Sequence, residues 1–216
     1  MAAVTRGKIT AMRHVERLID ELRPFVSDTR VLDAIADVPR DAFVPEQLRA
    51  HAYDNNALPI GHGQTISQPL VVARMTELLR VEPDDRVLDV GTGSGYHAAV
   101  LALLAAHVWT VERHRALSAQ AAANLVRAGV ANVTVLVGDG SRGLPAEAPF
   151  DAINVAAAAW PEVPPALERQ LARGGRLVAP VGASGQQLVL VEREDDDLTR
   201  TALEPVRFVP LIEGEP

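Results

Sequence analysis

A short apolar run that stops at closely spaced glycines constrains this chain more than any other feature. Residues 86–90 (RVLDV) are typical of a buried strand, and Gly91, Gly93 and Gly95 follow before the next helical pattern. Glycines at alternate positions allow a tight turn and let a ligand approach the backbone, because no Cβ stands in the way. The segment therefore predicts a strand, a glycine loop and a helix whose N-terminus is open to a ligand.

Strand and helix patterns alternate through the rest of the chain. Strands are expected at 86–90, 108–112, 133–140 with its loop, 150–156, 176–182, 186–194 and about 201–208, and helices at 96–106, 118–129 and 163–173. This alternation predicts an α/β fold with a doubly wound, mostly parallel sheet covered on both faces. The last two segments are expected to close it as an antiparallel pair.

The N-terminal part has a different pattern. Helices are expected at 15–22, ended by Pro24, and at 28–36, and another begins at Leu70. The segment 39–68 between them is rich in glycine and proline, which favours a long irregular loop, and such loops often carry function. We expect one domain over 1–216, with helices and active-site loop in 1–80 and the sheet in 81–216.

Composition excludes several classes of function. The 216 residues carry a net charge of −7, which disfavours binding to nucleic acid. The chain has no cysteine, so disulfides, thiolate metal sites and cysteine nucleophiles are excluded. No apolar run reaches the roughly 20 residues of a membrane span, and no apolar signal region is seen at the N-terminus. We expect a cytoplasmic protein without membrane or nucleic-acid partners.

An acidic residue lies at or close to the carboxyl end of each of three successive predicted strands. Asp89 lies two residues before Gly91, Glu112 ends the next strand, and Asp139 follows the third beside Gly140. A carboxylate near the glycine loop disfavours a diphosphate but suits a cationic ligand. Glu112 is placed to accept hydrogen bonds from ribose hydroxyls, and Asp139 to meet an adenine amino group. The pattern fits a phosphate-free cationic nucleoside, a description that matches S-adenosylmethionine.

Hydroxyl and imidazole groups in the loop before the sheet leave two interpretations open. Ser67 precedes the helix at Leu70, so it is either a helix cap or an active-site hydroxyl, and the two roles are compatible. His62 has no second ligand at helical spacing, so we expect no metal. Neither Ser67 nor Ser94 is centred in a G-x-S-x-G motif, which disfavours a serine hydrolase.

Seven segments in collinear order resemble one known family. They are FVPEQLRAHAY, LPIGHGQTISQP, VLDVGTGSGYHAAVLA, VGDG, FDAINVAAAA, GGRLVAPVG and RFVPL, within about Val31 to Leu211. Together they resemble the protein-L-isoaspartate O-methyltransferase family, and the TIS tripeptide in its setting is the most specific part. The resemblance implies a seven-stranded, Rossmann-like methyltransferase sheet with added N-terminal helices. It also implies methyl transfer from S-adenosylmethionine to the α-carboxylate of isoaspartyl residues in damaged peptides, after which the ester collapses to a succinimide that partly reopens to aspartate.

Site residues follow from the resemblance position by position. Ser67 matches the family's active-site serine and is also expected to border the cofactor. The other positions that match or flank cofactor-binding residues are Gln64, Thr65, Ile66, Asp89, Gly91, Gly93, Gly95, Glu112, Asp139 and Gly140. Residues 156–159 match a strip of small residues beside the substrate, and 207–211 are candidates for the peptide groove. Ala156 and Trp160 depart from the family pattern there. The resemblance further implies isoaspartyl polypeptides as partners, and we expect a monomer.

Three other functions fit parts of the sequence pattern. The nearest is an aspartyl O-methyltransferase that acts on a maturing peptide natural product. A second is an inactive cofactor-binding protein, which the intact TIS loop disfavours. A third is a nicotinamide-dependent oxidoreductase, which Asp89 and the glycine spacing disfavour because a dinucleotide fingerprint requires G-x-G-x-x-G.

Overall fold

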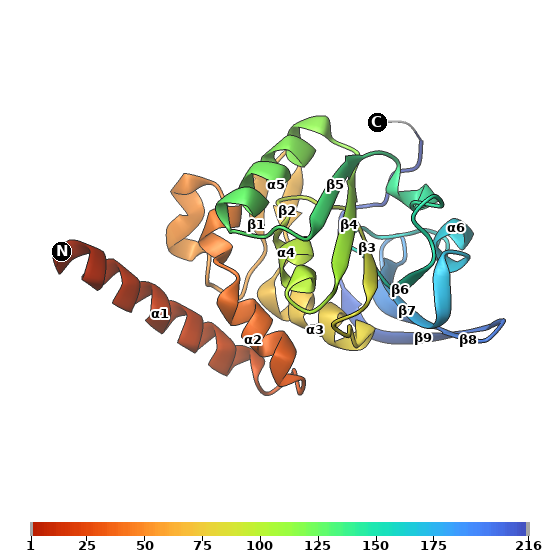
Figure 1. Ribbon diagram of the computed structural model, residues 1–216, viewed down its shortest axis with the longest axis horizontal. Helices are drawn as coiled ribbons and strands as arrows, with labels where there is room; N and C mark the ends of the chain where they lie inside the picture. Colours follow the sequence, from red (N-terminus) through yellow and green to blue (C-terminus); the bar gives the residue numbers. More distant parts are fainter. Residues whose placement is uncertain (1, 215–216) are drawn as a thin grey trace.

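A seven-stranded sheet forms the centre of the protein in the computed structural model, which describes residues 2–214 and their side chains from residue 12 onward (Figure 1). Its strands are β3 (Arg86–Val90), β4 (His107–Glu112), β5 (Val133–Val137), β6 (Phe150–Val155), β7 (Leu171–Val181), β8 (Gln186–Glu194) and β9 (Asp197–Val206). The order is β5-β4-β3-β6-β7-β8-β9, in which β3 to β7 pair in parallel and β8 pairs antiparallel with both β7 and β9. The mostly parallel sheet with an antiparallel closing pair is confirmed.

Three helices cover one face of the sheet. They are α3 (Pro69–Leu79), α4 (Tyr96–Ala102) and α5 (Arg115–Arg127). Met75 and Leu101 are fully buried against Val87 and Val108, because alternate strand residues point to this face. The helix α4 ends before the expected 106, and α5 begins before the expected 118.

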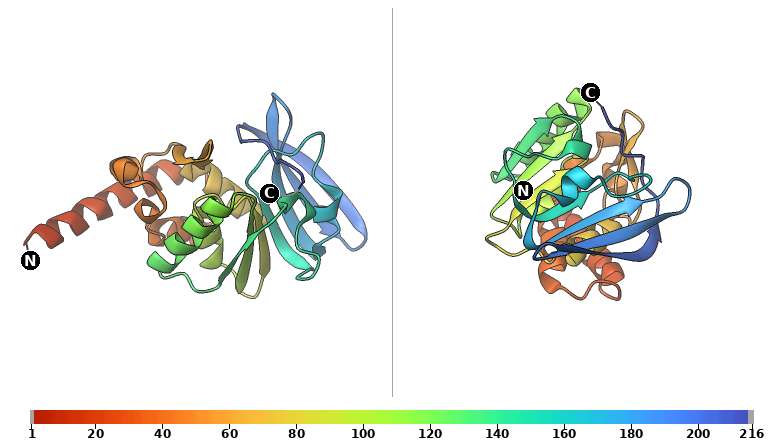
Figure 2. Two further views of the ribbon diagram at one scale, coloured as in Figure 1. Left: turned by 90° about the horizontal axis from the view of Figure 1, so that it is seen from above. Right: turned by 90° about the vertical axis from the view of Figure 1, so that its right-hand side faces the viewer.

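Two N-terminal helices, α1 (Ala2–Leu22) and α2 (Thr29–Asp37), pack beside α3 and α4. Asp28 caps α2 by accepting a hydrogen bond from the Arg30 N–H at 2.9 Å. The helix α1 starts earlier than the expected 15–22, and its first turns extend away from the rest of the molecule (Figure 2). Residues 1, 215 and 216, at the ends of the expected domain, lie outside the described residues. Within 2–214, no helix has the length and apolar character needed to span a lipid bilayer.

The opposite face of the sheet carries far less helix than expected. The predicted helix at 163–173 is wrong, because only α6 (Pro165–Glu168) is helical there and β7 already starts at Leu171. Gly174 and Gly175, which directly follow the predicted helix, lie inside β7, where Gly174 has φ +77°. A Cβ on Gly175 would lie 2.9 Å from the Asp151 carbonyl oxygen, so the pair forms a bulge in the strand.

The segment expected as an irregular loop contains regular structure. Residues 39–68 form two 3-10 helices, η1 (Arg40–Phe43) and η2 (Glu46–His51), and a hairpin of β1 (Leu58–Gly61) and β2 (Gln64–Ile66). Gly61, His62 and Gly63 all have positive φ at its turn, which explains the two glycines. A Cβ placed on Gly93 would lie 3.4 Å from Ile60 Cδ1 of the hairpin, so the hairpin covers the glycine loop.

Candidate active site

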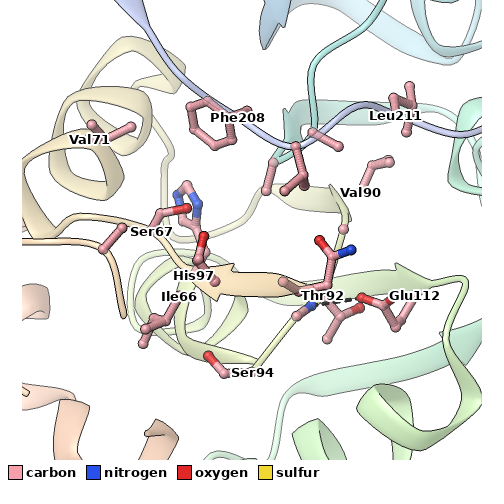
Figure 3. Close-up of a pocket in the computed structure, with 18 of the residues that line it drawn as sticks. Ile66, Ser67, Val71, Val90, Thr92, Ser94, His97, Glu112, Phe208 and Leu211 are labelled. Atoms are coloured by element: carbon pink, nitrogen blue, oxygen red, sulfur yellow. Dashed lines mark hydrogen bonds between the residues drawn. The ribbon is translucent and has the colours of Figure 1, made fainter. Parts of the chain in front are cut away.

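A cavity of about 600 Å³ opens at the carboxyl ends of β3, β4 and β6 (Figure 3). Its walls come from the sheet, from the end of the hairpin with the start of α3, and from the segment 205–212 after β9. This is the position at which doubly wound sheets bind ligands, and the volume is typical of a small-molecule site.

Most of the residues singled out from the sequence lie together on this cavity. Those that line it are Gln64, Thr65, Ile66, Ser67, Gly91, Gly93, Glu112 and Gly140. The segment 207–211 also lines it. Three predicted residues, Asp89, Gly95 and Asp139, do not line the cavity, and their positions are described below.

The glycine loop is held open toward the cavity by its own backbone. Gly91 and Gly93 have φ +93° and +53°, a left-handed conformation that residues with a Cβ rarely adopt. The Gly91 N–H donates to the Val111 carbonyl at 2.9 Å, which fixes the loop to the end of β4. Gly95 also has positive φ, but a Cβ there would lie 3.4 Å from Ala121 of α5, so it serves packing between helices.

Glu112 ties the glycine loop to the start of α5. Its Oε2 accepts the Gly93 N–H at 2.9 Å, and its Oε1 accepts the His114 N–H at 2.9 Å. The side chain is only 5 % exposed, although it lines the cavity. Each carboxylate oxygen can accept more than one hydrogen bond, so both remain able to bind hydroxyl donors of a ligand.

Ser67 does not cap α3. The cap position belongs to Gln68, with Pro69 in the first turn, and the Leu70 N–H donates to Asn55 Oδ1 at 3.1 Å. Of the two roles considered for Ser67, helix capping is therefore wrong. Figure 3 shows Ser67 beside His97, with Phe208 on the same side of the cavity.

The fully buried guanidinium of Arg40, which the sequence did not reveal, holds the backbone of Ser67 in place. Arg40 donates to the Ser67 carbonyl at 2.8 Å and to the Ala52 carbonyl at 2.9 Å. Its Cζ lies 4.6 Å from the ring centroid of Tyr96, the first residue of α4. Arg40 therefore joins the Ser67 loop to the helix that follows the glycine loop.

Asp89 lies beneath the cavity and does not face it. Its carboxylate is fully buried and accepts hydrogen bonds from Thr110 Oγ1 and Asn154 Nδ2, both at 2.7 Å. Both partners sit directly beside Asp89 in the neighbouring strands, so they share its face of the sheet. Burial raises the pKa of Asp89 to about 6, although these two hydrogen bonds act to lower it.

The hydrogen-bond network around Asp89 reaches the cavity at two points. The Thr92 and Thr110 hydroxyls lie 2.7 Å apart, and Asn154 Nδ2 also lies 3.1 Å from His97 Nδ1. His97 Nε2 lies 3.1 Å from the Thr76 hydroxyl. Burial lowers the pKa of His97 to about 3, so the imidazole is neutral at pH 7. In the sequence, the polar residues Thr110 and Asn154 interrupt otherwise apolar strand segments, and this pattern is the signal that could have indicated the network.

Asp139 is also turned away from the cavity. Its Oδ1 accepts from the Ser141 N–H at 3.0 Å and from the Ser141 hydroxyl at 2.6 Å, and its Oδ2 accepts from the Gly214 N–H at 2.8 Å. Burial acts to raise the pKa of Asp139, but these hydrogen bonds outweigh it and lower the pKa. Asp139 therefore does not line the cavity, and its contact with a ligand stays a prediction. Its neighbour Gly140 does line the cavity, and a Cβ there would lie 2.5 Å from Val90 Cγ1.

The raised pKa of Asp89 predicts a pH-dependent effect on stability. Its ordinary pKa is 3.8, so the folded state binds this proton more tightly, and the resulting stabilisation is lost as the pH rises through about 6. Replacing Asp89 with asparagine removes that loss. The free energy of unfolding of the variant, relative to the natural protein, is expected to rise by about 2–3 kcal/mol from about pH 4 to about pH 7.

Urea unfolding of both proteins at several pH values measures this difference. The opposite pH effect of the buried His97 is present in both proteins and cancels in the comparison. Asp33→Asn, at an exposed position of α2, is the matched control. A difference that stays constant with pH would contradict the raised pKa.

The sheet order, the glycine loop after its first strand and the acidic residue at the end of the next define the S-adenosylmethionine-dependent methyltransferase class of fold. A solved structure from Plasmodium falciparum, described as a putative protein-L-isoaspartate O-methyltransferase in complex with S-adenosyl-L-homocysteine, matches with a TM-score of 0.78 and 26% identity. The match covers 94% of this chain and 99% of that one. Another solved protein-L-isoaspartate O-methyltransferase matches with a TM-score of 0.81 and 30% identity, over 91% of this chain but 65% of that one.

A family model described as Protein-L-isoaspartate(D-aspartate) O-methyltransferase matches residues 13–216, and the chain belongs to this family. A curated Protein-L-isoaspartate O-methyltransferase of Aeromonas hydrophila is 56% identical over 202 residues, which is 93% of this chain and 98% of the relative. One of Roseiflexus castenholzii is 57% identical over 194 residues, which is 89% of this chain and 88% of the relative. The resemblance inferred from the sequence motifs is confirmed.

Proposed function

We propose that this chain is an enzyme that transfers a methyl group from S-adenosylmethionine to the α-carboxylate of L-isoaspartyl residues in damaged proteins and peptides. The observation that carries the proposal is the family membership over residues 13–216, with the TIS loop (65–67) on the same cavity as the glycine loop. The methyl ester then collapses to a succinimide, which partly reopens to aspartate and so starts repair. The curated relatives favour this function over methylation of a peptide natural product.

The cavity fits S-adenosylmethionine in size and charge. The backbone of Gly91 and Gly93 and the carboxylate of Glu112 would hold it, with Glu112 accepting hydrogen bonds from the ribose hydroxyls. Gly140 would border the adenine. When bound, the cofactor supplies an electrophilic methyl group on a positively charged sulfur. Asp89 places a negative charge beneath the cavity floor, while the neutral His97 adds no positive charge to oppose the sulfonium.

The substrate brings its own nucleophile, so this chain needs no general base. A free carboxyl group has a pKa near ~4 and is ionised at pH 7. Ser67 would donate a hydrogen bond to this carboxylate and orient one oxygen toward the methyl group. Ile66, Val71 and Phe208 line the same cavity and would exclude water, which strengthens the attraction between carboxylate and sulfonium.

Three broader features belong to the proposal. Residues 1–80 and 81–216 act as one domain, because segments from both parts line the cavity. The protein works as a monomer in the cytoplasm; the absence of cysteine suits a reducing compartment. Its partners are isoaspartyl polypeptides and not nucleic acid or membranes, in keeping with the net charge of −7.

A methylation assay with paired peptides tests the proposed function. The protein is incubated with methyl-labelled S-adenosylmethionine and with two peptides that differ only in aspartate or isoaspartate at one position. Base-labile label is expected in the isoaspartyl peptide alone. Equal labelling of both peptides, or labelling of neither, would contradict the proposal.

A further inference from the structure

A second cavity, of about 860 Å³, adjoins the cofactor cavity. Its walls are the residues around 158–160, the turn at 182–186 between β7 and β8, and the segment 206–211. Residues 206–208, 210 and 211 line both cavities, so this segment is the wall between them. Nothing in the proposed methyl transfer uses the second cavity.

Backbone hydrogen bonds hold the walls of this second cavity in place. The Ala158 N–H donates to the Val209 carbonyl at 2.7 Å, and the Leu211 N–H donates to the Ala158 carbonyl at 2.8 Å. The side-chain amide of Gln186 accepts the Phe208 N–H at 2.6 Å and donates to the Phe208 carbonyl at 3.0 Å. The cavity is therefore built on paired segments, which favours a preformed binding site.

Trp160 lines the second cavity and presents an exposed apolar surface. Its side chain is 67 % exposed, whereas the adjoining Ala157, Ala158 and Ala159 are buried. The large ring of an indole provides contact area at a low cost in conformational entropy, which is why tryptophan is enriched at binding surfaces.

Arg207 is the only charged residue among those that line the second cavity in the described part of the chain. It is exposed, and within residues 12–214 it forms no ion pair. Two arginines of the neighbouring strands are paired with carboxylates, Arg200 with Glu168 at 2.6 Å and Arg176 with Glu192 at 2.9 Å. A guanidinium without such a partner can pair with a carboxylate supplied by a ligand.

We propose that the second cavity binds the polypeptide next to the isoaspartyl residue, and that Arg207 selects a glutamate or aspartate side chain there while Trp160 covers its apolar part. The inference rests on the proposed function, because the isoaspartyl carboxylate would lie by Ser67 in the first cavity. Arg207 stands at the wall common to both cavities, so a residue adjacent to the isoaspartate in an extended chain, about 3.3–3.6 Å further along per residue, reaches it. The subsite selects for flanking sequence and takes no part in methyl transfer.

Isoaspartyl peptides with glutamate or glutamine next to the isoaspartate test this selection, with the neighbour placed before the isoaspartate in one pair and after it in another. In at least one pair the glutamate peptide is expected to have a KM about three- to tenfold lower, with kcat unchanged. The difference should shrink strongly at about 0.5 M salt, because salt screens an exposed ion pair. Arg207→Gln is expected to remove the preference, so that the KM of each glutamate peptide rises to that of its glutamine partner.

Two further variants separate the contributions. Trp160→Ala is expected to raise KM for both peptides of a pair alike. Arg173→Gln removes an exposed arginine at the opposite end of β7 and should keep the preference. Equal KM values within both pairs, or a preference that survives Arg207→Gln, would overturn the inference.

Peptide binding in the presence of S-adenosylhomocysteine, followed by tryptophan fluorescence, distinguishes failure of this inference from failure of the proposed function. Glutamate-dependent binding without methylation would support the subsite and contradict the isoaspartyl methyltransferase activity. Methylation of isoaspartyl peptides without any dependence on the neighbour would do the reverse.

Discussion

Replacing Ser67 with alanine is expected to lower kcat for an isoaspartyl peptide by about 10- to 100-fold, with the Kd for S-adenosylmethionine unchanged. A hydrogen bond to a charged group contributes roughly 1.5–3 kcal/mol, and about 1.4 kcal/mol corresponds to a tenfold change in rate. The hydroxyl is the part of Ser67 that can orient the substrate carboxylate, while its carbonyl, bound by Arg40, is kept in the variant. Steady-state kinetics and calorimetry measure the two quantities.

Ser118→Ala provides a matched control for this experiment, because Ser118 is a buried serine of α5 that does not line the cavity. Its kcat should match that of the natural protein. Normal turnover in Ser67→Ala would remove Ser67 from the reaction, and a weakened affinity for the cofactor would mean that Ser67 acts on the cofactor instead.

Glu112→Ala is expected to raise the Kd for S-adenosylmethionine by about 100-fold. The substitution would remove the two charge-assisted hydrogen bonds that we propose Glu112 makes to the ribose. It also leaves the N–H groups of Gly93 and His114 without the acceptor that Glu112 provides. Glu112→Gln retains the shape and one acceptor oxygen, so a smaller loss of about tenfold is expected. Titration calorimetry measures both values.

The exposed Glu82 supplies the control for lost negative charge, and Glu82→Ala should bind the cofactor normally. An unchanged Kd in Glu112→Ala would show that the end of β4 does not hold the ribose.

The sheet could be predicted because its central strands are short apolar runs separated by helical patterns. The errors lie where local pattern and tertiary pairing conflict. The pair Gly174 and Gly175 reads as a helix end, yet the pairing of β7 with β6 makes it a bulge within a strand. The strands of the hairpin 58–66 are too short to show an alternating pattern, so their glycines and proline predict irregular structure instead.

The same contrast between local pattern and tertiary pairing decides which site residues could be predicted. Residues of the glycine loop and Glu112 were predictable because their backbone positions at strand ends decide their location. The directions of the Asp89 and Asp139 side chains could not be predicted, because they depend on strand register and on distant partners such as Asn154 and Gly214. Arg40 and His97 were missed because their partners come from distant segments of the chain.

A crystal structure of the protein with S-adenosylhomocysteine tests the central claim most directly. The account predicts the ligand in the cavity of about 600 Å³, with its ribose hydroxyls in hydrogen-bond contact with Glu112 and its sulfur on the side of Ser67. A ligand bound elsewhere, a cavity left empty at saturating ligand, or a Ser67 side chain turned away from the sulfur would contradict it.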